Sequence, residues 1–218
     1  RSVSISHEDL GQFGYLYSPE KDKWHVSDLA IDFLYVGSNS LDFEVPGTLG
    51  IIQDHTKSVL KTGYYPIYDK GNINLIDPNE ISFYSINCMD DNYAKIRSLK
   101  NSIIILEASQ NSGFQQQRRF FIELMNQGIN NPVIIKRSYD GLSNENFLLH
   151  ASSDIGGLQL DGMGDGIWVE SSNDGSFVNQ TAFGILQASR TRISKTEYIS
   201  CPSCGRTLFD LQETTAKI

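Results

Sequence analysis

Two cysteines near the end of the chain have the spacing of a metal or cluster site. Cys201 and Cys204 stand in the run Cys-Pro-Ser-Cys-Gly-Arg, between an expected strand and an expected helix. A C-x-x-C turn directs both sulfurs to one side, so two thiolates can bind one metal ion or one iron–sulfur cluster. The same spacing serves redox-active disulfides. Three interpretations stay open: metal or cluster binding with further ligands beyond Ile218, a redox dithiol, and a chance pair.

A glycine-rich segment with two carboxylates is the second candidate. Residues 161–166 read Asp-Gly-Met-Gly-Asp-Gly, which could cradle a phosphate, or bind a divalent cation through Asp161 and Asp165. The segment matches neither G-x-x-x-x-G-K-[ST] nor G-x-G-x-x-G, and the residues after it predict a strand rather than a helix. We therefore favour a tight turn between two strands, in which glycine supplies positive φ angles.

The other reactive side chains show no catalytic spacing. Cys88 follows an expected strand and is interpreted as a small core residue. Arg118 and Arg119 are expected on a solvated helix face. The histidines form no H-x-x-H or H-E-x-x-H motif, and each is predicted to be solvated or singly packed: His7, His25, His55 and His150. Spacing alone assembles no Ser-His-Asp set and no pair of catalytic carboxylates, so the catalytic residues stay unknown.

The elements that must position these residues alternate between strands and helices from residue 81 onward. Expected strands are 81–87, 102–107, 132–136, 157–161, 166–170 and 197–200, and expected helices are 90–100, 115–127, 143–151 and 179–192. Alternation of this kind implies a parallel sheet with helices packed outside it. A doubly wound sheet and a (β/α)8 barrel fit the pattern equally well. In both, ligands meet the loops after the strands, here expected at 109–113, 138–141 and 161–166.

The first 80 residues give a weaker pattern. Short strands are expected at 24–26 and 32–37, and the segment 49–60 fits a strand or a helix. The segment 63–78 combines proline, glycine, asparagine and aromatic residues, which is typical of a surface connection or a hairpin.

Composition narrows the class of protein. The chain has 218 residues with 18 Lys plus Arg and 26 Asp plus Glu, a formal net charge of −8. This charge argues against a nucleic acid or an anionic membrane as the main partner. The length fits one large domain, or one domain and a fragment. Three cysteines are too few for a disulfide scaffold, so a reducing, intracellular compartment is expected. A start without Met and an end inside an amphipathic pattern indicate a piece of a longer protein.

Three segments of the last third of the chain carry a family resemblance. They read DGMGDG at 161–166, GILQASRTR at 184–192 and TEYISCPSCGRTLFDLQ at 196–212. Together they closely resemble 4-hydroxy-3-methylbut-2-enyl diphosphate synthase, the iron–sulfur enzyme of the non-mevalonate isoprenoid pathway. The resemblance is dense over 157–218 and thin over 1–156. The sequence of these segments is most similar to the long, three-domain form of plants, apicomplexans and some bacteria.

The resemblance implies a fold and a domain division. It predicts an α/β fold, in which residues 1–192 form a parallel β/α barrel-like domain (TIM-like, with a complete or an incomplete barrel), inserted in the middle of the long form. Residues 193–218 would begin the C-terminal [4Fe–4S] reductase-like domain. Cys201 and Cys204 match the first two ligands of the cluster iron. The family's third Cys and its Glu ligand would then lie beyond Ile218.

The resemblance also implies a reaction for the parent protein. That enzyme reductively converts 2-C-methyl-D-erythritol 2,4-cyclodiphosphate to 4-hydroxy-3-methylbut-2-enyl diphosphate, with electrons from ferredoxin or flavodoxin. The substrate would bind mainly to an N-terminal barrel that this chain lacks, in a parent that could be a homodimer of the bacterial cytoplasm or a plastid-type organelle. The chain alone is expected to be an inactive structural spacer without the [4Fe–4S] cluster. If the resemblance is set aside, the residues alone allow an alternative, a small zinc- or dithiol-containing α/β protein.

Overall fold

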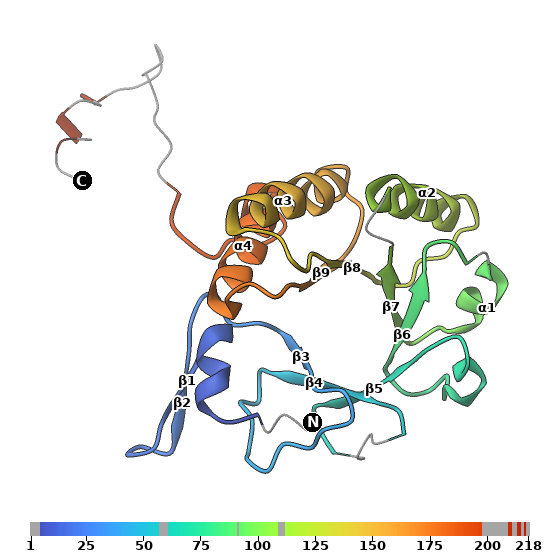
Figure 1. Ribbon diagram of the computed structural model, residues 1–218, viewed down its shortest axis with the longest axis horizontal. Coiled ribbons are helices and arrows are strands. Elements are labelled where there is room, and N and C mark those ends of the chain that lie inside the picture. Colours follow the sequence, from blue (N-terminus) through green and yellow to red (C-terminus); the bar gives the residue numbers. More distant parts are fainter. Residues whose placement is uncertain are drawn as a thin grey trace.

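The fold is a curled parallel sheet with helices on its outer side. The computed structural model describes residues 5–56, 61–90, 92–108 and 112–197, and the positions 209, 210, 213, 214 and 216. The sheet has seven strands: β3 (Phe33–Tyr35), β4 (Gly50–Asp54), β5 (Tyr64–Tyr68), β6 (Ser82–Asn87), β7 (Ser102–Glu107), β8 (Val133–Ser138) and β9 (Gly166–Glu170). Figure 1 shows the strands curving around a common centre, with α2, α3 and α4 outside them.

The order of the strands separates the two architectures that the sequence left open. Every strand of this sheet pairs in parallel with the next strand of the sequence, from β3 through to β9. A doubly wound sheet would reverse its strand order at a switch point, whereas a barrel keeps sequential neighbours paired. The expected parallel, barrel-like α/β fold is therefore confirmed. The barrel is incomplete, because β3 and β9 are the two ends of the strand order.

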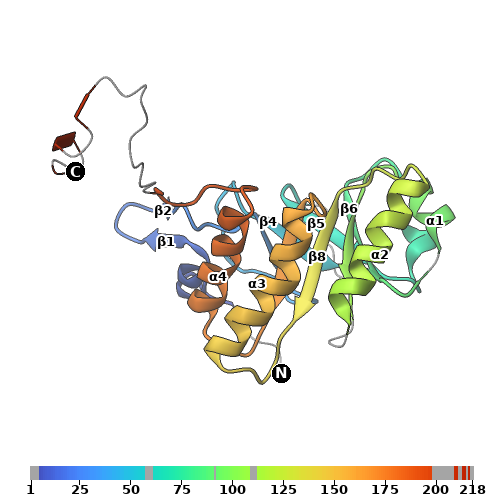
Figure 2. The ribbon, with the colours of Figure 1, turned by 90° about the horizontal axis from the view of Figure 1, so that it is seen from above.

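Four α-helices follow β6 in the described residues: α1 (Tyr93–Ser98), α2 (Gly113–Asn126), α3 (Asn144–Leu160) and α4 (Gly175–Ala188). The first three connect successive strands, and α4 follows β9. Side-chain caps fix the starts of the last two. The Ser143 hydroxyl accepts a hydrogen bond from the Asn146 amide at 3.3 Å, and the Asp174 carboxylate accepts one from the Phe177 amide at 3.1 Å. Each such cap satisfies an amide that has no partner within its helix. Figure 2 shows α3 and α4 running side by side along the outside of the sheet.

Two expectations for individual elements were wrong. Residues 157–161, expected as a strand, contain the last turn of α3. Phe147, Ala151, Ile155 and Leu158 continue one buried helical stripe into it, and this stripe outweighs the two glycines at 156 and 157. Residues 63–78, expected as a connection or hairpin, contain the parallel strand β5 and the short helix η2 (Ile73–Leu75). The expected strand 197–200 lies almost wholly outside the described residues.

The first part of the chain forms a small layer of its own beside α4. The helix η1 (Glu8–Phe13) precedes an antiparallel hairpin of β1 (Tyr15–Ser18) and β2 (Lys23–Val26). Asn179 of α4 donates a hydrogen bond to the carbonyl of Leu29 at 2.9 Å, and Arg192 pairs with Asp32. These contacts tie the helix next to the last strand to the segment that enters the first strand of the sheet.

The sheet divides the core into an outer and an inner part. On the outer side, Ile104, Leu106 and Ile135 are fully buried against the helices. On the inner side, Ile52, Phe83 and Ile105 form a smaller buried cluster, with partly buried residues around it. Successive side chains of a strand alternate between these two sides. In the described residues, no helix is long and apolar enough to cross a membrane.

Substitution of Gly164 tests how tightly the turn before β9 packs. Gly164 has a φ of +90°, and a Cβ built there would lie 2.6 Å from Cδ1 of the fully buried Ile135. Gly164→Ala should cost about 3 kcal/mol of unfolding free energy, from backbone strain and overpacking together. The matched control is Gly162→Ala, because Gly162 has a φ of +73° with open space around it, so only the strain of about 1 kcal/mol applies. Equal losses in urea unfolding would contradict this packing.

Candidate functional site

The two cysteines with cluster spacing lie outside the described residues. The structure therefore gives Cys201 and Cys204 no geometry. Over the residues it does describe, no three His, Cys, Asp or Glu side chains lie together in a way that could hold a metal ion. Cys88 is a buried member of the outer core, as expected, and burial raises the pKa of its thiol. A protonated, buried thiol is a poor nucleophile and a poor metal ligand.

The glycine-rich segment 161–166 is structural. It follows α3 and precedes β9, so it lies where the strands begin; the expectation that it meets a ligand at their carboxyl ends was wrong. Asp165 accepts a hydrogen bond from the Val133 amide at 2.8 Å, and its own amide donates to the Val133 carbonyl at 2.7 Å. Asp161 pairs with Arg118, which is partly exposed on α2. The tight turn with positive φ angles is confirmed, but it joins a helix to a strand.

The histidines are packed or solvated, as their spacing indicated. His25 and His150 are exposed. The ring of His7 lies against three aromatic rings of the N-terminal layer, with the centre of Phe43 at 4.1 Å. His55 stacks on Tyr68, with the ring centres 5.1 Å apart.

Polar side chains converge inside the curled sheet, where the strands end. They line a cavity of about 380 Å³, whose walls include Tyr35, Asp54, His55, Glu107, Lys136 and Trp168. We call this cavity the mouth. Barrel enzymes bind their ligands at this end of the strands. The mouth is therefore the candidate functional site within the described part of the chain.

Lys136 of β8 is the charged centre of the mouth. Its Nζ lies 2.9 Å from Oε1 of Glu107 and 3.3 Å from Oε1 of Glu170. It also lies 4.7 Å from the ring centre of Trp168, a cation–π contact. Burial acts to lower the pKa of Lys136, but the two carboxylates outweigh it and raise the pKa. The amine stays protonated, so it cannot act as the neutral nucleophile of a Schiff-base mechanism.

Tyr35 and Asp54 form the opposite wall. The Tyr35 hydroxyl donates a hydrogen bond to Oδ1 of Asp54 at 2.7 Å. The rings of Tyr35 and Trp168 lie 5.2 Å apart, across the gap between the two end strands. Burial, with the hydrogen bond to Asp54, raises the pKa of Tyr35 to about 12. The mouth therefore presents a neutral phenol, an ammonium group and several carboxylates.

Sequence reasoning missed this set because its members come from separate strands and form no motif. A signal was present in the strand periodicity. On three strands an inward apolar residue is followed two positions later by a polar one that faces the mouth: Ile52 by Asp54, Ile105 by Glu107 and Ile134 by Lys136. Without knowledge of which strands are neighbours, that pattern cannot be combined into one site.

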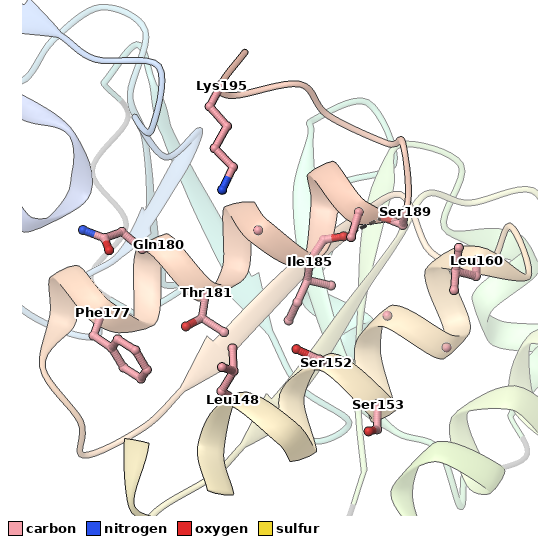
Figure 3. Close-up of a pocket in the computed structure, with 14 residues that line it drawn as sticks. Leu148, Ser152, Ser153, Leu160, Phe177, Gln180, Thr181, Ile185, Ser189 and Lys195 are labelled. Carbon is pink, nitrogen blue, oxygen red and sulfur yellow. Dashed lines mark hydrogen bonds between the residues drawn. The ribbon is translucent and has the colours of Figure 1, made fainter. Parts of the chain in front are cut away.

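A second hollow lies on the outer surface, between α3 and α4. Figure 3 shows Leu148 and Ser152 of α3 facing Thr181 and Ile185 of α4. Its volume is about 680 Å³, and Lys195 is the one titratable side chain among the residues that line it. Such a groove can receive apolar side chains, but it has no arrangement of groups for catalysis.

The pKa of Tyr35 predicts a pH-dependent stability. Folding raises this pKa from 10.0 to about 12. The protonated Tyr35 hydroxyl therefore contributes to the unfolding free energy fully below pH 10, and this contribution is lost as the pH rises toward 12. The wild-type chain should lose unfolding free energy relative to Tyr35→Phe over this interval, and the difference between the two should be constant below it. Urea unfolding at a series of pH values measures this; a difference that stays constant through pH 11 contradicts the raised pKa of the phenol.

Known proteins resemble this chain over part or all of its length. No protein-family model matches it. A 4-hydroxy-3-methylbut-2-en-1-yl diphosphate synthase (flavodoxin) of Parabacteroides distasonis is 34% identical over 99% of the chain and 34% of its own length. The corresponding protein of Protochlamydia amoebophila is 47% identical over 58% of the chain and 19% of its own length. A chloroplastic (ferredoxin) form of Arabidopsis thaliana is 41% identical over 59% of the chain and 19% of its own length.

These matches agree with the resemblance carried by the segments at 161–166, 184–192 and 196–212. The aligned part amounts to between about a fifth and a third of the length of these relatives. The curled parallel sheet is also the fold that the resemblance implied. The chain belongs to the 4-hydroxy-3-methylbut-2-en-1-yl diphosphate synthase family.

Proposed function

We propose that the chain is an internal part of a long, three-domain synthase. Residues 1–192 would be its inserted middle domain, and residues 193–218 the start of its C-terminal iron–sulfur domain. The observation that carries the proposal is the similarity to the Parabacteroides distasonis protein, which extends over 99% of the chain but only 34% of that relative. The barrel-like fold of the described residues supports a self-contained middle domain, since its strands and helices already enclose an outer and an inner core.

The whole protein would carry out a reductive elimination. It would convert 2-C-methyl-D-erythritol 2,4-cyclodiphosphate to 4-hydroxy-3-methylbut-2-enyl diphosphate, taking up two electrons and releasing water. The names of the bacterial relatives specify flavodoxin and that of the chloroplastic relative ferredoxin, so we propose one of these as the electron donor. A bacterial cytoplasm or a plastid-type organelle is the proposed location, and a homodimer the proposed assembly.

Cys201 and Cys204 would be the first two ligands of the cluster iron. Their chemistry fits this role, because adjacent thiolates at C-x-x-C spacing are the usual ligands of iron–sulfur clusters. The remaining ligands are proposed to lie beyond Ile218. When bound, the cluster would pass the electrons to the substrate, and the two thiolates would hold it at the boundary between the middle domain and the C-terminal domain.

The middle domain is proposed to act as a spacer without catalysis of its own. Two of the groups in its mouth support this role. Lys136 is held protonated between two carboxylates, and the Tyr35 phenol is neutral up to about pH 12. Neither provides the base or nucleophile near neutral pH that general catalysis needs.

Removal of one thiolate from the full-length protein tests the ligand assignment. Cys201→Ser or Cys204→Ser should abolish or strongly weaken both the visible absorption of the cluster and the reductive activity, because one iron loses its ligand. Cys88→Ala is the matched control, since Cys88 is buried in the outer core, and should leave both signals nearly intact. Iron and acid-labile sulfide should exceed zinc in the purified protein. Stoichiometric zinc without sulfide would instead favour a zinc protein.

The same cysteines should contribute little to the stability of this chain alone. The described residues already form cores of their own, and the chain is proposed to lack the other cluster ligands. Replacing both by serine should shift the midpoint of thermal unfolding by less than about 2 °C. A loss of several degrees would show that the pair supports the barrel, and would contradict the boundary proposed near residue 192.

A further inference from the structure

The mouth of the barrel carries an excess of negative charge. Three carboxylates belong to it, those of Asp54 and Glu107 in its wall and that of Glu170 on Lys136; a fourth, Asp69, lines its outer part. Lys136 is the only lysine or arginine among the described lining residues. A cavity with low-dielectric walls and one sign of charge concentrates ions of the opposite sign. The electrostatics of the mouth therefore favour a cationic ligand.

The surroundings of Lys136 show which kind of cation the mouth accommodates. The Lys136 ammonium already lies between the carboxylates of Glu107 and Glu170 and over the indole face of Trp168, at 2.9, 3.3 and 4.7 Å. Carboxylates and aromatic faces together are the groups that bind alkylammonium ions. Asp54 and the stacked rings of His55 and Tyr68 line another part of the same cavity. That part has no ammonium among its described residues.

The geometry disfavours the other ligand classes. No three carboxylate, imidazole or thiolate groups among the described residues converge in the way that a metal ion requires. A phosphate would meet the carboxylates of Asp54, Glu107 and Glu170, and the one ammonium that could bind it is already paired twice. An organic cation, by contrast, can place its charge near Asp54 and its methylene groups against the aromatic rings.

We infer that the mouth binds a small organic ammonium ion, of the class of short aliphatic diamines, with one ammonium group near Asp54 and the rings of His55 and Tyr68. This inference goes beyond the spacer role and does not depend on it, because binding at the mouth requires neither the cluster nor the parent's reaction. A ligand there would contact β4, β5 and β7 and so could stabilise the barrel against unfolding.

Calorimetry on the 218-residue chain at low salt tests the inference, with 1,4-diaminobutane as the probe. We expect saturable one-to-one binding that weakens as salt is added. Asp54→Asn should weaken it by about tenfold through loss of one nearby charge, while the Tyr35 hydroxyl can still donate to the new amide. The matched control Glu20→Gln removes an exposed carboxylate between β1 and β2 and should leave the affinity unchanged. Equal effects of the two variants would show general attraction to an acidic protein and would overturn the site.

Two neutral or anionic comparators and one spectroscopic measurement complete the test. 1,4-Butanediol and inorganic diphosphate should not bind; equal affinity for the diol, or preference for diphosphate, would overturn the assignment to an ammonium ion. The chain has two tryptophans, and Trp168 lines the mouth whereas Trp24 packs in the N-terminal layer. The diamine should shift the indole N–H resonance of Trp168 and leave that of Trp24 in place. A shift confined to Trp24, or no shift at saturation, would place binding elsewhere and refute the inference.

Discussion

The sequential parallel pairing of the strands determines most of this structure. Because β3 to β9 each pair with the next strand, every connection must cross back over the same side of the sheet, and the helices collect there. The other side then curls inward and must be filled by the alternate side chains of the same strands. Ile52, Phe83 and Ile105 fill its middle. The layer above them is polar, since it lies where the strands end and water enters.

An incomplete barrel has two strand edges, and this chain covers them with side chains. Tyr35 of β3 and Trp168 of β9 meet across the gap at 5.2 Å. Outside the gap, Asn179 and Arg192 hold α4 and the segment after it to residues 29–32. An open parallel edge would otherwise be a template for pairing with another chain. The polar and aromatic residues of the mouth thus have a structural role in addition to the ligand binding inferred above.

Local sequence patterns predicted those elements that carry an apolar run or follow a clear turn. The strands β7 and β8 have continuous apolar runs, and β9 follows a clear turn, so their positions were predictable. The strand β5 was missed because Pro66 and four partly exposed neighbours give it neither an apolar run nor an alternation. The end of α3 was missed because two glycines interrupt a stripe that tertiary packing maintains. The mouth was missed for a different reason, since strand neighbours, which no local pattern contains, bring its residues together.

Charge distinguishes this barrel from one that binds a diphosphate. In the family that the chain belongs to, the substrate is proposed to bind to a separate N-terminal barrel, and a dianionic ligand requires basic or amide groups at the mouth. Here Lys136 is already bound to Glu107 and Glu170, and Asp54 accepts a hydrogen bond from Tyr35. The carboxylates of this mouth therefore repel a diphosphate, which the mouth of the proposed N-terminal barrel would attract. This difference in sign supports the proposal that residues 1–192 are a middle domain and that the phosphorylated substrate reacts in other parts of the parent protein.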